Sequence, residues 1–215
     1  MGITIFARGI IDRIGDILSL INDVKEVAGE HNWKYRIIDD DFDKQPNAVI
    51  SRKESSASVC AIEGSLGLKG IIITVDSGAE PFMILFDRSG VLTDMMQQMS
   101  WISSNGKDER FTMCKTQFGS IDSHIRIIEL LDSLKKKYIS DLAVNDEGAF
   151  WETRDRRILA EKRIFLGQCI RQTEKVINSI ETHDDDARDA ETIARRIEEA
   201  LLKADEDGQL PRQQA

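Results

Sequence analysis

The sequence predicts an α+β protein: an antiparallel sheet of about five to seven strands, two helices packed on one face of that sheet, and a helical C-terminal extension. Short segments rich in β-branched residues, separated by Gly and Ser, fill most of the first 120 residues. Apolar residues recur at spacings of three and four in two segments, 10–29 and 121–138. No proline occurs between Pro81 and Pro211, which permits long helices in the second half.

The first expected elements are a short strand over 3–6 and a helix over 10–29. The strand is predicted because β-branched and aromatic residues fill it. The helix is predicted because its apolar residues follow one another at spacings of four and three, which places them on one helical face. These residues are Ile10, Ile14, Ile17, Ile21, Val24 and Ala28.

A strand with one buried face is predicted next, because Trp33, Tyr35 and Ile37 alternate with charged residues. Residues 87–90 form a turn that ends in Gly, where a positive φ is needed. Sequential strands joined by such short turns pair antiparallel. The remaining strands are expected over 48–53, 58–62, 68–75, 81–87, 91–92 and 111–118.

The second half of the chain is predicted to be helical. A helix over 121–138 has an apolar stripe and ends in three lysines, whose charge suits the negative end of the helix dipole. A loop over 141–154 follows, and apolar stripes then predict helices over 155–180 and 186–203.

Charge divides the chain into two parts. From Glu181 onward the chain contains 11 acidic and five basic residues, a far stronger acidic excess than in the preceding 180 residues. The fourth helix has only a thin apolar stripe, so it must pack on the core or on a partner helix. We expect a single α+β domain over 1–180, a helical extension over 181–203 and a disordered tail over 204–215.

Composition excludes several classes of function. The chain has 29 basic and 38 acidic residues, a net charge of −9 and a pI near 5.0, which argues against binding to nucleic acid. The chain contains no run of about 18 apolar residues that could span a membrane. Arg8 and Asp12 interrupt the apolar N-terminal segment, and a secretory signal does not tolerate charged residues there. Three widely spaced cysteines indicate no disulfide framework and a reducing, cytoplasmic location.

No complete metal or cofactor motif is present. Residues 39–43 place acids at positions 1, 3 and 5 of a calcium-loop pattern, but Lys44 replaces the required Gly and Ile50 the required Glu. A looser divalent site of oxygen ligands remains an alternative to a solvated turn. The glycines of 64–70 match no phosphate-binding loop and indicate a hairpin turn, and the three histidines lie on separate segments. We therefore predict no metal and no cofactor.

The candidates for acid–base catalysis are Asp41, His124, Glu147 and Glu152. Carboxylates and imidazole are the groups that transfer protons near neutral pH, and these four lie in or beside predicted loops. Cys114 and His124 could form a thiolate–imidazole pair, but a cysteine within a strand is more often a small buried hydrophobe.

The candidates for ligand binding are Ser120, Ser123 and Trp151. Free N–H groups at the start of the helix over 121–138 could bind an anion with the two hydroxyls, although Ser120 is better explained as an N-cap. Trp151 follows Phe150 in a loop, where aromatic rings either pack on the core or form a binding surface. We expect Trp151 to be largely buried.

These observations favour a non-catalytic binding or assembly module that forms a symmetric homodimer through its C-terminal helices. The alternative is a hydrolase that uses the carboxylates and His124 in a groove near the loop over 141–154. Convergence of the catalytic candidates on one concave pocket would favour the enzyme, and their dispersal would favour the module.

Overall fold

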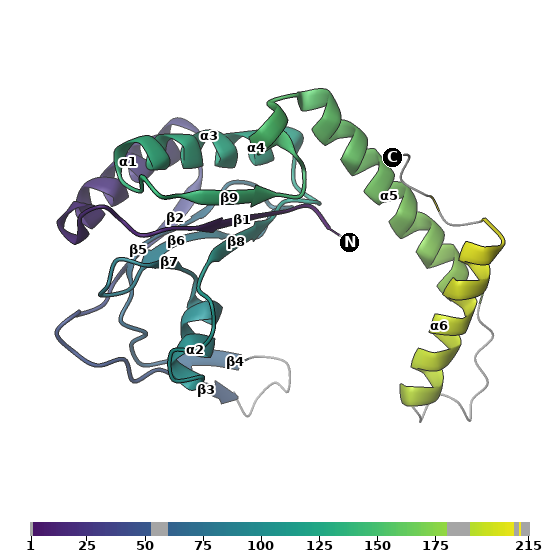
Figure 1. Cartoon of the computed structure of the whole chain (residues 1–215), viewed down its shortest axis with the longest axis horizontal. Helices are drawn as coiled ribbons and strands as arrows, with labels where there is room; N and C mark the ends of the chain where they lie inside the picture. Colours follow the sequence, from purple (N-terminus) through teal and green to yellow (C-terminus); the bar gives the residue numbers. More distant parts are fainter. Residues whose placement is uncertain (1, 53–59, 180–189, 209–210, 212–215) are drawn as a thin grey trace. The chain divides into compact units, whose positions relative to one another are not determined.

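The computed structural model describes residues 2–52, 60–179, 190–208 and 211, and the chain forms two compact units (Figure 1). One unit is Gly2–Arg156 and the other begins at Arg157. The boundary suggested by charge, after residue 180, falls outside the described residues. The packing of the chain places the boundary earlier, between residues 156 and 157. Charge balance indicates how a segment is solvated, and it does not show which segments pack together.

The first unit contains all the strands of the described chain. In chain order its strands are β1 (Thr4–Arg8), β2 (Lys34–Asp39), β3 (Val49–Arg52), β4 (Cys60–Glu63), β5 (Lys69–Thr74), β6 (Phe82–Phe86), β7 (Leu92–Thr93), β8 (Thr112–Lys115) and β9 (Ala143–Asp146). Its helices are a 3₁₀ turn (Ile14–Asp16), α1 (Ile17–Glu30), α2 (Met95–Ser103), α3 (Ile121–Lys137) and α4 (Phe150–Thr153).

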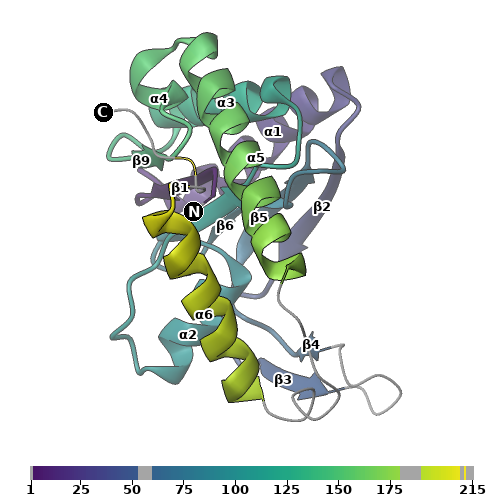
Figure 2. The same ribbon diagram turned by 90° about the vertical axis from the view of Figure 1, so that its right-hand side faces the viewer.

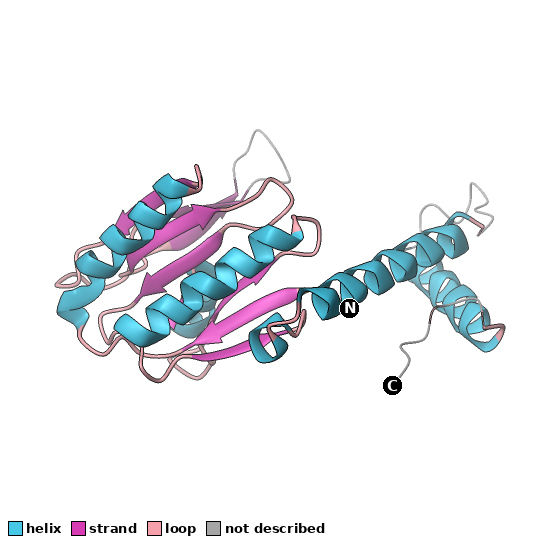
Figure 3. Ribbon diagram, turned by 90° about the horizontal axis from the view of Figure 1, so that it is seen from above, coloured by secondary structure: helices cyan, strands magenta, loops and turns pink. Residues whose placement is uncertain are grey.

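The strands pair antiparallel, which confirms the predicted fold class, but the described residues form nine strands in three sheets instead of one sheet of five to seven. Within the described ranges the sheets have the orders β8-β1-β9, β2-β5-β6-β7 and β3-β4. The first two are joined by backbone hydrogen bonds of 2.9 Å, from Leu92 to Gly9 and from Glu80 to Lys115. Helices α1 and α3 lie on one face of these strands, as predicted (Figure 3).

The core fills both faces of the central strands. Ile71 and Ile73 of β5 are fully buried on the side of α1. Ile72 points the other way, since successive side chains of a strand alternate, and packs with Leu66 and Leu85 beside α2. The three consecutive isoleucines of β5 are thus explained by a strand covered on both sides.

Strand β2 differs from the prediction. Trp33 is buried, but the side chains of Tyr35 and Ile37 are 48% and 43% exposed. The period-two alternation correctly predicted a strand, yet the expected buried face was wrong. The reason is position: β2 is the last strand of its sheet, and α1 covers only part of it.

Three other elements also differ. Helix α1 begins at Ile17, because Ile10 pairs with Val91 in an isolated β-bridge instead of joining the helix. Helix α2 and strand β9 were not predicted. Strand β9 lies within the predicted loop 141–154 and pairs antiparallel with β1.

The second unit consists of α5 (Arg156–Asn178, whose first residue belongs to the other unit) and α6 (Ala190–Glu206), shown in green and yellow in Figure 2. Both helices were predicted. Helix α6 extends past the predicted end at residue 203, and Ala204 is buried, so the start of the expected disordered tail is helical. Residues 209, 210 and 212–215 of that tail lie outside the described residues. In the described part of the chain, no helix combines the length and apolarity needed to cross a membrane.

Candidate functional site

His124 lies at the centre of a buried hydrogen-bond network that joins three segments. It belongs to the first turns of α3 and has no exposed surface. Its Nδ1 is 2.7 Å from the hydroxyl oxygen of Thr116, and its Nε2 is 3.1 Å from Oδ2 of Asp146. With the proton on Nε2, the imidazole donates to the carboxylate and accepts from the hydroxyl. The network fixes the segment before α3, the helix and the end of β9 in one arrangement.

Asp146 carries the charge in this network. Its side chain is fully buried, and its oxygens accept backbone N–H bonds of 2.7 Å from Gly148, 2.7 Å from Phe150 and 3.0 Å from Trp151. Burial on its own raises the pKa of this carboxyl. The hydrogen bond from His124, with those from the backbone N–H groups, outweighs burial and holds the pKa of Asp146 below its ordinary value.

This arrangement contains the hydroxyl, imidazole and carboxylate groups of a catalytic triad, but a substrate cannot reach them. Thr116 and His124 are both 0% exposed, so no substrate atom could reach the hydroxyl without opening the core. The geometry is that of a buried polar network in which every member is hydrogen-bonded. Its role is structural.

The N-terminus of α3 is capped from within the chain. The Oγ of Ser120 accepts from the backbone N–H of Ser123 at 3.0 Å, so Ser120 is the N-cap. The backbone N–H of Ser120 and the hydroxyl of Ser123 each donate to Oδ2 of Asp76 at 2.8 Å. A carboxylate of the chain therefore occupies the place that the sequence left open to an external anion.

Asp76 is held in its charged form by this arrangement. The backbone N–H of Gly78, followed by the donors of Ser120 and Ser123, lowers the pKa of Asp76 to about 2. Gly78 also permits the close approach, because a Cβ at this position would lie 2.1 Å from the carbonyl oxygen of Phe118. No sequence pattern indicated Asp76, which is 44 residues from Ser120.

The aromatic pair after β9 is divided between core and surface. Phe150 is buried, and Trp151 is partly buried. The guanidinium carbon of Arg154 lies 4.8 Å from the centre of the Trp151 ring and covers one of its faces.

The acids predicted beside this pair do not form a site. Glu147 accepts the backbone N–H of Thr4 at 2.8 Å, and Glu152 is exposed on α4. The buried acid is Asp146, which sequence reasoning missed. Its signal was the pattern Asp-Glu-Gly over 146–148, typical of an aspartate that hydrogen-bonds its own backbone two residues on.

The acidic side chains at the end of β2 each interact with a different partner within the chain. Asp39 forms an ion pair with Lys69 at 2.7 Å, Asp40 accepts the N–H of Leu68 at 3.0 Å, and Asp41 accepts the N–H of Asp43 at 3.0 Å. Within the ranges that the structure describes, no group of three or more His, Cys, Asp or Glu side chains could hold a metal ion.

Cys114 is inert as a nucleophile. Its thiol is fully buried and lies 3.1 Å from the carbonyl oxygen of Glu80, to which it donates. Burial, with a smaller contribution from the charge of Glu80, raises the pKa of Cys114 to about 12. The sequence-based interpretation as a small buried hydrophobe is confirmed.

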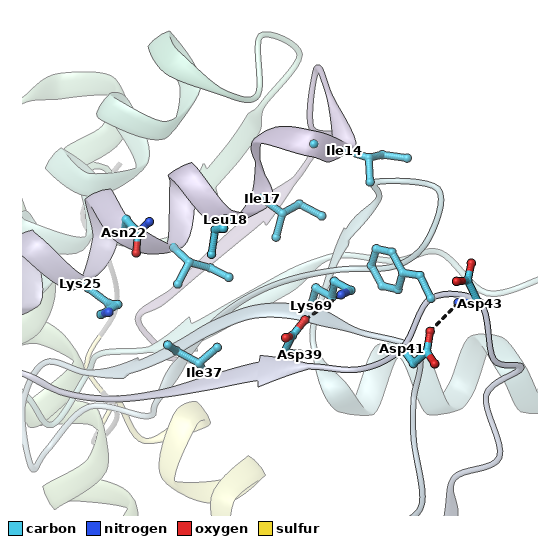
Figure 4. Close-up of a pocket in the computed structure, with 13 residues that line it drawn as sticks. Ile14, Ile17, Leu18, Asn22, Lys25, Ile37, Asp39, Asp41, Asp43 and Lys69 are labelled. Atoms are coloured by element: carbon cyan, nitrogen blue, oxygen red, sulfur yellow. Dashed lines mark hydrogen bonds and ion pairs between the residues drawn. The ribbon is translucent and has the colours of Figure 1, made fainter.

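A groove of about 600 Å³ lies between α1 and the outer strand β2 (Figure 4). Leu18 of α1 and Ile37 of β2 are both exposed and line it, and Asp41 and Asp43 lie at one end. Of the four catalytic candidates, only Asp41 lines this groove. Its surface is mainly apolar, and the ion pair of Asp39 with Lys69 lies at its floor.

A second groove, of about 620 Å³, lies along α5. Ile170 and Ile177, which are 42% and 40% exposed, share it with Leu166, Cys169 and neighbouring polar residues. Residues separated by four and seven positions lie on one side of a helix, so these isoleucines belong to a continuous stripe.

The structure thus brings His124 to the end of β9, as expected, but through Asp146 and not through the predicted glutamates. Asp41 belongs to a different groove. Comparison with known protein families, curated proteins and solved structures finds nothing that matches this chain.

Proposed function

We propose that the protein is a non-catalytic assembly module of the cytoplasm that self-associates through α5 and α6. The observation that carries this proposal is the exposed stripe on α5. Ile170 and Ile177 leave 42% and 40% of their surfaces in solvent and line one groove with Leu166 and Cys169. Away from this stripe, Ile164 of α5 and Leu202 of α6 are each 60% exposed. A stripe of exposed apolar side chains along one helix is typical of an interface between chains.

Opposite charges on the two helices support helix pairing. Helix α5 contains six basic and two acidic residues, and α6 contains three basic and five acidic residues. Two copies can therefore form a bundle in which each basic helix lies beside an acidic one, with the isoleucine stripes at the centre. A twofold dimer is the commonest arrangement for such a contact.

Two further observations favour a module over a hydrolase. The four catalytic candidates do not line one cavity, and the arrangement that most resembles a catalytic triad is sealed in the core. The cytoplasmic location is supported by Cys114 and Cys169, which are free thiols.

Point variants of the full chain test the proposal. Ile170→Glu together with Ile177→Glu places two charges in the stripe on each copy, and we expect the sedimentation coefficient to fall below that of the parent because the contact through α5 is lost. The control is Gln168→Glu, which adds one negative charge at an exposed position on the opposite side of α5. A double variant that sediments like the parent and the control would refute the role of α5.

A further inference from the structure

Strand β2 is an open sheet edge with a defined set of free backbone groups. The backbone N–H of Asp40 bonds the carbonyl of Leu68 at 3.0 Å, and the register with β5 continues to Asp39 opposite Lys69. In an antiparallel pair, residues that bond the neighbour alternate with residues that do not. Tyr35, Ile37 and Asp39 therefore direct their N–H and C=O groups away from β5.

Among the described residues, nothing pairs with this edge, and its side chains are exposed. The sheet order ends at β2, and Tyr35 and Ile37 are nearly half exposed. On the same face, Ile14 of the 3₁₀ turn and Leu18 of α1 are 45% and 67% exposed and line the groove with Ile37. A long edge with free backbone groups beside an apolar groove is a template for a further strand.

Charge identifies the occupant. Lys34 and Arg36 stand at the beginning of β2, and Asp39, Asp40, Asp41 and Asp43 stand at its end and beyond. In the part of the chain that the structure describes, Lys34 and Arg36 form no ion pair. The strand therefore complements itself when a second copy runs antiparallel, whereas a parallel copy would place like charges together.

We propose that β2 pairs with β2 of a second copy, antiparallel, with the twofold axis passing through Ile37. This interface goes beyond the proposed function, because it uses a surface of the α+β unit and not α5 or α6.

The register follows from symmetry and from the free backbone groups. A twofold axis perpendicular to the sheet keeps each side chain on its own face. Two residues can then lie opposite one another only if the sum of their residue numbers is even. The axis through Ile37 is the one that pairs all three outward residues: Ile37 with its copy, and Tyr35 with Asp39 in both directions. Each pair exchanges two backbone hydrogen bonds.

The side chains agree with this register. On one face, Lys34 lies opposite Asp40 of the second copy, twice by symmetry. On the other, Ile37 meets its own copy, and α1 of each chain lies on the same side of the joined sheet. The exposed flanks of the two helices, with Ile14 and Leu18, then face each other across the axis. An axis through Arg36 would place two guanidinium groups together.

Disulfide trapping in the full chain tests the register. Across a hydrogen-bonded antiparallel pair, Cα atoms are about 5.5 Å apart, a distance that a disulfide can bridge. Ile37→Cys, in a background with Cys60→Ser and Cys169→Ser, is expected to give a covalent dimer on mild oxidation. Arg36→Cys and Ile38→Cys are the matched controls, because each lies about 8 Å from its own copy and should remain monomeric on a denaturing gel.

Amide hydrogen exchange gives an independent readout. The amides of Tyr35, Ile37 and Asp39 should gain protection as protein concentration rises, while those of Arg36 and Ile38 should be protected throughout. Equal cross-linking of the three cysteine variants, preferred cross-linking of either control, or protection that does not change with concentration would each overturn the proposal.

These measurements separate the two interfaces. Both are repeated in the variant with Ile170→Glu and Ile177→Glu, in which the contact through α5 is absent if the proposed function is correct. Cross-linking at position 37 that persists there shows that β2 pairs independently. A parent chain that uses both surfaces forms assemblies larger than a dimer, unless the two interfaces share one axis.

Discussion

Replacing His124 with alanine tests whether the buried network is structural. The substitution removes the hydrogen bond to Asp146, which is charge-assisted and contributes about 1.5–3 kcal/mol, and the bond to Thr116, which contributes about 1 kcal/mol. The empty space left by a fully buried imidazole adds a cavity cost. We expect the free energy of unfolding to fall by about 3 kcal/mol or more, a large share of the 5–15 kcal/mol typical of a domain.

The assay is urea unfolding of the full chain at pH 7, with His31→Ala as the matched control. His31 is a partly exposed residue at the end of α1, and its loss should cost less than about 1 kcal/mol. For a unit of this size, about 3 kcal/mol corresponds to a decrease of roughly 6–12 °C in melting temperature. An unfolding free energy within about 1 kcal/mol of the control would refute the reasoning. Because the folded state depresses the pKa of Asp146, its contribution is complete at neutral pH and is lost as pH falls below about 4.

Three further outcomes are expected. Asp76→Asn should lower the unfolding free energy by about 1–2 kcal/mol at pH 7. Because the folded pKa of Asp76 is about 2, the carboxylate contributes fully above about pH 4. In unfolding measurements, the difference from the parent should therefore disappear as pH falls from about 4 to about 2. Trp151→Ala should cost about 1–2 kcal/mol by thermal melting, since the ring is only partly buried, and a cost near 4 kcal/mol would show that it is core. A fragment ending at Arg156 should unfold in a single cooperative transition, because the first unit has its own core. If the fragment shows no cooperative transition, α5 is part of that core.

Sequence periodicity was sufficient for most elements, because the interactions that define them are local. The stripes of α1, α3, α5 and α6 repeat within one or two helical turns, and alternation over five residues is enough to indicate β2. Helix α2 was missed although Met95, Met99 and Ile102 recur at spacings of four and three and pack on the core, because the helix has only nine residues and such a short pattern is a weak signal. Strand β9 was missed because its four residues pair only with β1, more than 130 positions away.

Burial and site chemistry depended on the tertiary structure. Alternation shows which side chains share a face of β2, but the position of β2 at the end of its sheet decides that Tyr35 and Ile37 stay exposed. Ser120 could be recognised as an N-cap, since a cap acts on its own helix.

The sequence by itself determined the α+β class, the antiparallel pairing and the two C-terminal helices, because these follow from patterns of neighbouring residues. Only the tertiary structure decided that Asp146 binds His124 and that Asp76 binds Ser120 at the start of α3. Those partners are 22 and 44 residues apart, and a carboxylate finds such a partner only when the folded backbone closes the intervening chain and removes water from between them.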